Sequence, residues 1–165
     1  MTKEKFIAII SEEQESLRRF LLALCGGDRM EAEDIAQEAM IKAYIAIDRF
    51  VERAKFATWL FKIAYNTFLD HQRSGWNRCE ELDAAAQIPG GSNADAAFAY
   101  QDLYKAIGTL PLREKSAILL FYVSGYSVKE IAKITGSSSI AVRKQLSRGR
   151  DKLRQILEQG KMMQQ

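Results

Sequence analysis

Apolar residues recur at helical spacing through the first half of the chain, and no stretch alternates as a strand would. The spacing predicts a first helix over about residues 3–25 and a second over about 30–48, for which Asp28 is a suitable N-cap. A third helix is predicted over about 56–73, with Thr58 as a candidate cap near its start. We expect these helices to form one small domain at the N-terminus.

The helical spacing is lost between residues 75 and 94. This stretch contains Pro-Gly-Gly-Ser-Asn at 89–93, the strongest turn signal in the chain, preceded by a run of alanines and scattered acids. No apolar period there could bury a face against another helix. We therefore expect residues 75–94 to be a flexible linker between two domains, residues 1–74 and 95–165.

Helical spacing resumes after the linker. Apolar residues separated by three or four positions predict the first helix of the second domain: Tyr100, Leu103, Ile107 and Leu110. Pro111 suits the first turn of a following helix, which Gly125 would end.

The next segment has the parts of a helix-turn-helix. Ser127 and Glu130 have capping-box spacing, so each side chain can bond the other's backbone N–H at the start of a short helix, 128–135. Gly136 would end that helix, and three serines offer a turn and a second cap before a helix over 140–157. The sequence therefore predicts an all-α protein of two small helical domains, with the helix-turn-helix in the C-terminal one.

The helix over 140–157 has an apolar stripe and an opposite polar stripe. The apolar stripe is made by Val142, Leu146, Leu153 and Ile156. The polar stripe is made by Arg143, Ser147, Arg150 and Arg154, with Lys144 and Arg148 beside it. Gly149 lies inside this helix, where a glycine costs about 1 kcal/mol relative to alanine. We expect close approach to the preceding helix, or to DNA, to explain why a glycine occurs there.

Charge is uneven along the chain, although the net charge is only +3. Residues 128–154 carry eight Lys or Arg against two acids, whereas residues 75–97 carry one Arg against four acids. The second helix of a helix-turn-helix fits the DNA major groove with its N-terminal residues nearest the bases, which places Arg143 and Lys144 for base contact. Phosphate contact suits the residues further along, Arg148, Arg150 and Arg154. The alternative is a solvated basic face at the end of a helical bundle.

Composition argues against several other classes of protein. The charged N-terminal segment is unlike a signal peptide, and no apolar run approaches the roughly 18 residues that a membrane span needs. Cys25, Cys79 and the single histidine His71 lack metal-ligand spacing, and no Gly-rich phosphate loop is present. We therefore expect a cytoplasmic protein without membrane insertion, catalytic residues, metal or cofactor, in which both cysteines are reduced thiols.

Several motif blocks resemble a known family. Residues 32–43 resemble the second conserved region of bacterial sigma factors, and residues 48–50 and 56–73 resemble its promoter-melting part. Residues 110–120 and 126–153 resemble the fourth region. The chain is similar to the extracytoplasmic-function (ECF) group of sigma factors, which keeps only these two regions. The resemblance covers nearly all of residues 5–157.

The resemblance implies a transcription initiation factor that binds core RNA polymerase and directs it to specific promoters. Its partners would be the clamp helices of the largest polymerase subunit, the flap of the second large subunit, promoter DNA and an anti-sigma factor. Four polar residues match the position of the clamp contact: Asp34, Gln37, Glu38 and Lys42. Judged from the residues alone, they could also be an ordinary solvated helix face with Glu38 and Lys42 paired.

The resemblance also implies two DNA contacts. The minus-ten element would be read and opened by Phe50 and Asn66, with Lys62, Asp70 and Arg73 nearby and Trp59 in a supporting position. Melting would use binding energy alone, without nucleotide hydrolysis. The minus-thirty-five element would be bound as duplex by Arg143, Lys144, Ser147, Arg148 and Arg150, although many relatives carry a larger side chain than Ser147.

Two other kinds of protein fit part of the pattern. A conventional regulator would use the helix-turn-helix to bind an operator without polymerase, but it leaves residues 56–73 unexplained. A helical adaptor that binds only protein would not need six basic residues on the final helix.

Overall fold

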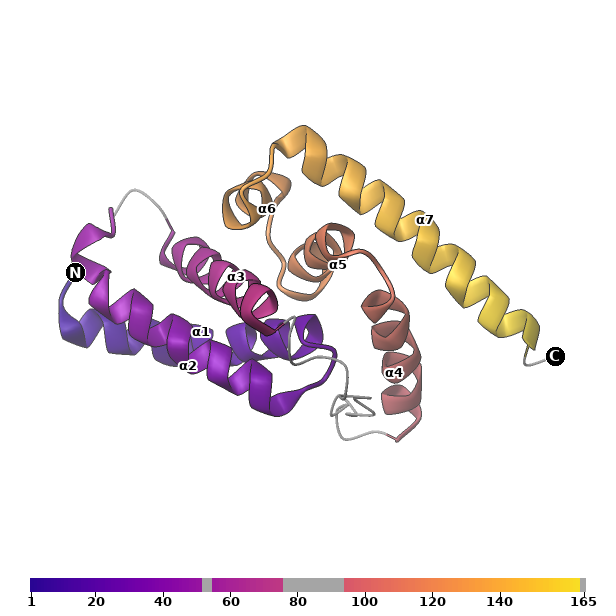
Figure 1. The fold of residues 1–165 in the computed structure, drawn as a ribbon, viewed down its shortest axis with the longest axis horizontal. Coiled ribbons are helices and arrows are strands. Elements are labelled where there is room, and N and C mark those ends of the chain that lie inside the picture. The colour runs from indigo at the N-terminus through magenta and orange to yellow at the C-terminus, as the bar shows by residue number, and fades with distance from the viewer. Residues whose placement is uncertain (52–54, 76–93, 164–165) are drawn as a thin grey trace.

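The computed structural model describes residues 1–51, 55–75 and 94–163, and every regular element in these ranges is helical (Figure 1). The prediction of an all-α protein is confirmed. Except for its two ends, the predicted linker lies outside the described residues.

The N-terminal helices pack as a three-helix unit. They are α1 (Lys3–Leu24), α2 (Arg29–Ile45) and α3 (Phe56–Gly75), with a 3-10 turn at Ile47–Arg49. The buried face of α2 is largely alanine, which lets its backbone lie close to the bulky side chains of α1 and α3, such as Phe20 and Phe61.

Local capping explains where α2 begins, but two sequence predictions in this unit were wrong. Asp28 caps α2 as predicted, because its side chain accepts a hydrogen bond from the backbone N–H of Glu31 at 3.1 Å. The helix ends at Ile45, however, and the residues up to Arg49 form the 3-10 turn. Thr58 is not a cap, since it is buried inside α3 and its hydroxyl has no hydrogen-bond partner among the described residues.

The C-terminal helices are α4 (Ala94–Gly108), α5 (Leu112–Ile118), α6 (Val128–Thr135) and α7 (Ser139–Met163). The helix predicted to run from Pro111 to Gly125 changes character after α5, where Leu119–Val123 form a π-helix, η2. The backbone N–H of Ser124 accordingly donates to the carbonyl of Leu119 at 3.0 Å, one residue further back than in an α-helix.

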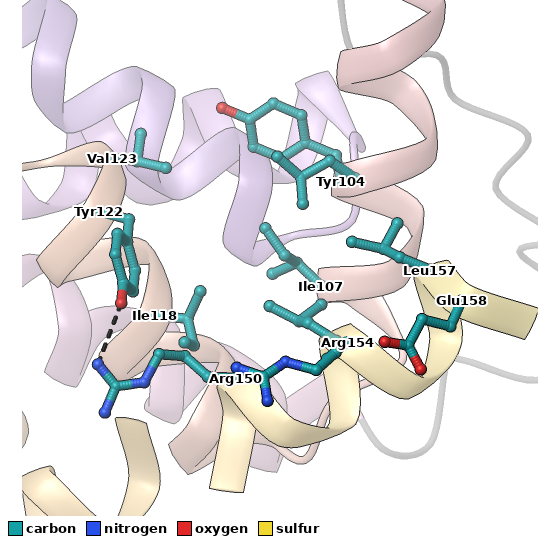
Figure 2. A pocket seen from close by; sticks show the side chains of 11 residues that line it. Tyr104, Ile107, Ile118, Tyr122, Val123, Arg150, Arg154, Leu157 and Glu158 are labelled. Carbon is teal, nitrogen blue, oxygen red and sulfur yellow. Dashed lines mark hydrogen bonds between the residues drawn. The ribbon is translucent and has the colours of Figure 1, made fainter. Parts of the chain in front are cut away.

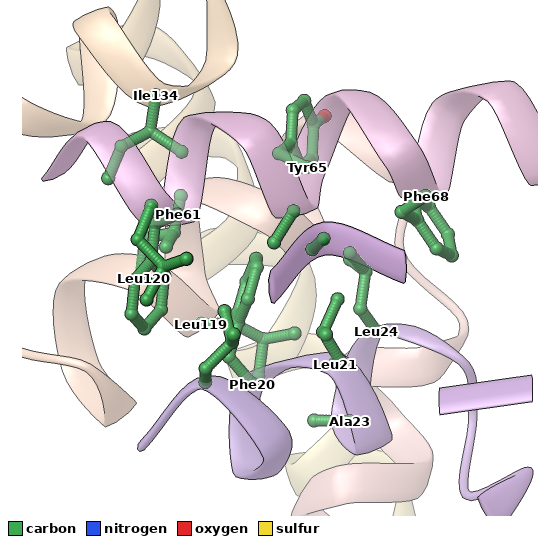
Figure 3. Close-up of a cluster of buried hydrophobic side chains, with 14 of the residues drawn as sticks. Phe20, Leu21, Ala23, Leu24, Phe61, Tyr65, Phe68, Leu119, Leu120 and Ile134 are labelled. Carbon is green, nitrogen blue, oxygen red and sulfur yellow. The ribbon is translucent and has the colours of Figure 1, made fainter. Parts of the chain in front are cut away.

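The two sets of helices share one continuous core, which the sequence did not predict. Helix α6 packs against α3 (Figure 1). The π-helix η2 packs against α1. Figure 3 shows the cluster between them, with Phe61 of α3, Leu119 and Leu120 of η2, Ile134 of α6 and Phe20 of α1 gathered together. All five side chains are almost fully buried, so in this structure the N- and C-terminal helices form a single packed body.

Candidate nucleic-acid interface

The helix-turn-helix is defined at its ends by hydrogen bonds. Ser127 and Glu130 form the predicted capping box, with N–H to side-chain distances of 3.2 and 3.3 Å. Gly136 ends α6 in the left-handed conformation, with φ of 72°. The side chain of Ser138 then accepts from the N–H of Ala141 at 3.1 Å and caps the start of α7. These bonds fix where α7 begins relative to α6.

Four of the five residues predicted to bind the minus-thirty-five element lie together on α7. Val142 and Leu146 are buried against the rest of the C-terminal helices. The opposite side of the same turns is exposed and carries Arg143, Lys144, Ser147 and Arg148. Three positive charges on one exposed face near the start of the second helix suit a polyanionic duplex.

Arg150 differs from those four residues in its contact with η2. Its guanidinium donates a hydrogen bond to the hydroxyl of Tyr122 at 3.2 Å (Figure 2). Successive α-helical residues are rotated by about 100°, so Arg150 and Arg154 lie further along the same stripe of α7 as Arg143. The Arg150 guanidinium nevertheless turns towards η2. The structure therefore places Arg150 at the edge of a groove.

That groove runs between α4, η2 and α7 and has a volume of about 660 Å³ (Figure 2). Its lining is mainly apolar and includes Leu103, Ile107, Ile118, Val123, Leu153 and Leu157. Arg150, Arg154 and Glu158 also line it. Sequence reasoning did not identify this groove, because its walls come from helices distant in the chain.

Gly149 is buried against α5. An added Cβ would lie 2.8 Å from Cγ1 of Ile118, closer than two carbons can approach. Of the two reasons expected from the sequence, close helix packing therefore accounts for this glycine, although the neighbour is α5 and not the preceding α6.

The residues predicted to act at the minus-ten element lie along one side of α3. Lys62, Asn66, Asp70 and Arg73 are all exposed. Their spacing of three or four residues keeps them on one stripe of the helix. The sequence prediction is consistent with a continuous polar surface there.

Phe50 lies beside the N-terminal end of α3. It is partly buried in an aromatic cluster, with its ring centroid 5.2 Å from Trp59 and 5.5 Å from Phe56. Trp59 is also partly buried, and its supporting role at the minus-ten element stays a prediction. The cluster fixes the Phe50 ring at the N-terminal end of α3, the helix that also carries Asn66.

The four polar residues of α2 divide into two pairs. Asp34 and Gln37 are exposed on the outward side. Glu38 and Lys42 turn towards α3: Glu38 meets Nε2 of His71 at 2.5 Å, and Lys42 Nζ lies 3.4 Å from the hydroxyl of Thr67. The hydrogen bond from His71, followed by that from Lys42, lowers the pKa of Glu38 below its usual value.

The outward side of α2 also carries apolar residues that sequence reasoning missed. Ile41 and Ile45 are 60% and 74% exposed, and Met30 is 80% exposed. Neither isoleucine lies on the buried face of α2, which consists of alanines and Ile35. An apolar residue outside that face was therefore the signal in the sequence that could have identified this surface. An exposed helix face with large aliphatic side chains next to Asp34 and Gln37 is typical of a protein-binding surface.

The described ranges contain no group of three or more His, Cys, Asp or Glu side chains that could hold a metal ion. None of the helices in those ranges is both long enough and apolar enough to cross a membrane.

Comparison with known proteins agrees with these two helical units. Residues 9–78 match Sigma-70 region 2, and residues 100–153 match Sigma-70 region 4. The ECF sigma factor EcfG of Rhodopseudomonas palustris is 30% identical over 145 residues, covering 86% of this chain and 79% of EcfG. SigW of Bacillus subtilis, another ECF sigma factor, is 32% identical over 79% of this chain and 78% of its own.

This chain belongs to the ECF RNA polymerase sigma factors. It is therefore a promoter-specific transcription initiation factor, in a family of regulatory proteins that are not known as enzymes. Its fold matches that of the sigma factor RpoE from Bartonella quintana, solved in complex with the anti-sigma factor NepR, with a TM-score of 0.83 and 26% identity over 94% of this chain and 98% of RpoE. CnrH, solved with the cytosolic domain of CnrY, shares the fold at a TM-score of 0.73 and 22% identity, covering 95% of this chain and 90% of CnrH.

Within this sigma factor, region 2 comprises α1–α3 and region 4 contains α5–α7. The exposed stripe on α3 belongs to region 2, and the outward basic face of α7 belongs to region 4. The two candidate DNA surfaces therefore lie in different conserved regions.

Proposed function

We propose that this sigma factor contacts core polymerase through α2 and the groove of region 4, and reads the promoter through α3 and α7. The observation that carries this proposal is the outward face of α7, where basic side chains are exposed on a helix whose start is fixed by the Ser138 cap. Residues 1–74 and 95–165 would serve as the two functional units.

The outward face of α7 binds the minus-thirty-five element as duplex. Arg143 and Lys144 lie in the first turns, where base edges are within reach, and Arg148 lies further along, where phosphate is nearer. Ser147 has a short side chain, so it contributes a hydrogen bond and leaves space for water. Arg150, which bonds Tyr122, takes part in the adjacent groove instead of base recognition.

The exposed stripe of α3 opens the minus-ten element. Asn66 offers both donor and acceptor groups to the edge of an extruded base, and Phe50 offers an aromatic face. Lys62 and Arg73 are placed to neutralise the backbone of the separated strand. Opening then uses binding energy released as the strand is captured, so no nucleotide is hydrolysed.

The outward side of α2 binds the clamp helices of the largest polymerase subunit. Asp34 and Gln37 supply polar contacts, and Ile41 and Ile45 supply apolar area that is uncovered in the described structure. Glu38 and Lys42 remain bonded to α3 and connect the polymerase contact to the promoter-opening helix.

The groove of region 4 binds the flap of the second large subunit. An apolar groove edged by Arg150 and Arg154 suits a partner segment with apolar and acidic side chains. Because the groove lies beside the outward face of α7, duplex and flap can be bound at the same time.

An anti-sigma factor is a further proposed partner, because the similar sigma factor RpoE was solved in complex with the anti-sigma factor NepR. Since core RNA polymerase works in the cytoplasm, we place this sigma factor there. It requires no cofactor for the binding steps described.

In vitro transcription with core polymerase on a supercoiled promoter library tests the function. Adding the sigma factor should produce discrete transcripts that core polymerase alone does not make. A conventional regulator would instead bind operator DNA in a gel shift without polymerase and give no transcript. Failure to associate with core polymerase would contradict the proposal.

A further inference from the structure

The last two turns of α3 bury little apolar area. Phe68 is the last buried residue of this helix, and Asp70, Gln72 and Arg73 beyond it are exposed. Leu69 is the one apolar side chain of α3 after Phe68, and it is only partly buried. Segments with few buried apolar contacts open most easily. The polar contacts with α2 therefore decide how firmly this end of α3 is held.

His71 makes the shortest of these polar contacts. Its Nε2 atom lies 2.5 Å from one carboxylate oxygen of Glu38. The other carboxylate oxygen of Glu38 lies 3.3 Å from Nζ of Lys42. On the next residue of α3, the side-chain amide of Gln72 donates to Glu31 at 3.4 Å. Two carboxylates of α2, two helical turns apart, therefore hold the end of α3.

The charged groups of α2 that face His71 are the acids Glu38 and Glu31 and the cation Lys42. The hydrogen bond from His71 lowers the pKa of Glu38 below its usual value, so this carboxylate is ionised at neutral pH. Burial and then the charge of Asp28 raise the pKa of Glu31, and the charge of His71 lowers it. Within the described residues, the His71 side chain has its hydrogen bond and ion pair with α2 alone, although α1 and α6 also pack on α3.

The contact between His71 and Glu38 changes in strength with pH. Histidine changes its charge between about pH 5 and 8, and His71 is the single histidine of the chain. A protonated ring forms a charge-assisted bond with the ionised carboxylate, whereas a neutral ring forms only an ordinary hydrogen bond. The contact is therefore strongest at the acidic end of this range, and it weakens as the pH rises and the imidazole loses its proton.

We propose that His71 is a positioning residue for promoter opening, which holds the end of α3 on α2 through Glu38 and makes opening depend on pH. This inference rests on the proposed function, because Asp70 and Arg73 on this end of α3 belong to the proposed minus-ten surface. A firmly held helix presents these two side chains in one arrangement, so less ordering is needed when the separated strand binds. The same contact joins the minus-ten surface to α2, the helix proposed to bind polymerase.

His71→Gln separates the charge from the hydrogen bond. The glutamine amide can donate to Glu38 as a neutral imidazole does, but it carries no charge at any pH. Permanganate footprinting with the same core polymerase, at about pH 6 and at about pH 8, measures opening by both proteins. At the lower pH, we expect the unaltered protein to form about twofold to fivefold more open complex than His71→Gln, because the pair is partly exposed. At the higher pH, the two proteins should form equal amounts.

Two further variants separate the charge of His71 from general loosening of α3. Glu38→Gln removes the ionised partner, so adding His71→Gln to it should cause little further change in the pH profile. Gln72→Ala is the matched control, because it removes a bond from the same end of α3 without removing a titrating group. It should lower opening by the same factor at both pH values. A pH profile that His71→Gln leaves unchanged would overturn the proposal.

Hydrogen exchange of the free protein tests the contact without transcription. At the lower pH, peptides from the last turn of α3 should exchange about twofold to fivefold faster in His71→Gln than in the unaltered protein. At the higher pH the rates should be equal, and peptides from α7 should not differ at either pH. Equal exchange at the lower pH would also count against the proposal. If the unaltered protein directs no transcription at either pH, the proposed function is wrong, whereas the exchange rates still report on the contact.

Discussion

The close approach of α7 to α5 depends on one residue, Gly149. Its hydrogen occupies the space where any larger side chain would meet Ile118, which is itself buried. The intrinsic helix penalty of glycine is therefore offset by the packing of a neighbouring helix, and DNA contact is not needed to explain it.

Gly149→Ala should destabilise the protein by up to about 2 kcal/mol, because overpacking of Ile118 costs about 1–3 kcal/mol and the gain in helix propensity offsets only about 1 kcal/mol of it. Urea unfolding followed by circular dichroism measures the change. Gly160→Ala on the same helix is the matched control, since an added Cβ there meets nothing within 4 Å. Equal stability of the two variants would show that α5 and α7 can move apart freely.

Cys25 should be unreactive at neutral pH. Burial, followed by the nearby carboxylates of Glu31 and Asp28, raises the pKa of its thiol to about 12. The thiol therefore stays protonated, and the thiolate is the reactive form. In a Cys79→Ser background, we expect iodoacetamide to label native protein at least tenfold more slowly than urea-unfolded protein. Equal rates would mean that α1 opens readily at this point.

At the scale of single helices, α7 separates DNA contacts from protein contacts. Arg143→Ala with Lys144→Ala should weaken promoter binding by at least tenfold and leave binding to core polymerase unchanged, because these side chains face outward. Arg150→Ala is the matched control, and it should have the smaller effect on promoter affinity because its guanidinium bonds Tyr122. Filter binding of promoter DNA by holoenzyme measures the promoter affinity. Binding of the variant to core polymerase without DNA measures the other affinity. Equal loss of both affinities would contradict the assignment of α7.

Helix α3 should act after the promoter is first bound. Asn66→Ala removes the polar edge proposed to hold the extruded base, so it should reduce the open complex several-fold while closed-complex affinity changes little. Permanganate footprinting reports unpaired thymines and measures opening directly. Unchanged thymine reactivity would exclude a role for Asn66 in melting.

Individual helices were the most predictable part of the molecule, because caps are local. Asp28, the Ser127–Glu130 box and Gly136 act within one turn, and the structure has each where the sequence predicted it. The prediction that Thr58 caps α3 was wrong, because a threonine near the start of a helix can equally be buried within the helix. The outward isoleucines of α2 were missed because they face a surface that is not part of the chain's own core.

The shared face of site residues was predictable where the residues lie on one helix, and contacts between helices were not. The spacing along α3 and α7 brings most of their site residues onto single faces, as helical geometry requires. Arg150 was grouped with Arg143 because both lie on the polar side of the sequence pattern. Its bond to Tyr122 joins residues 28 positions apart, and no local pattern shows such a contact.

At the scale of the whole molecule, the packing of region 2 against region 4 was not predictable from periodicity. Phe61 and Leu120 each occupy an apolar position that fits the core of its own region. Only the three-dimensional arrangement shows that they belong to one cluster (Figure 3). Periodicity identifies which residues are buried, but it does not identify what buries them.

Because the core is shared, the free protein should unfold in one cooperative transition. Scanning calorimetry should give a single peak, with calorimetric and van't Hoff enthalpies that agree. Ser116→Ala should broaden this peak or divide it, since it removes the buried hydrogen bond between Ser116 of α5 and Tyr65 of α3. Ser11→Ala, which removes an exposed hydroxyl bonded within α1, should leave the peak unchanged. Two separate transitions in the unaltered protein would mean that the regions fold independently.

Deletion of a single residue should have different structural effects in the π-helix at Leu119–Val123 and at the start of α7. Within that stretch the Ser124–Leu119 bond already spans an additional residue, so a deletion can close the turn as an ordinary α-helix and leave the flanking helices in place. The same deletion at the start of α7 would turn every later side chain by about 100° and carry Arg148 away from the duplex. Relatives can therefore differ in length before the helix-turn-helix and still read DNA with the same face.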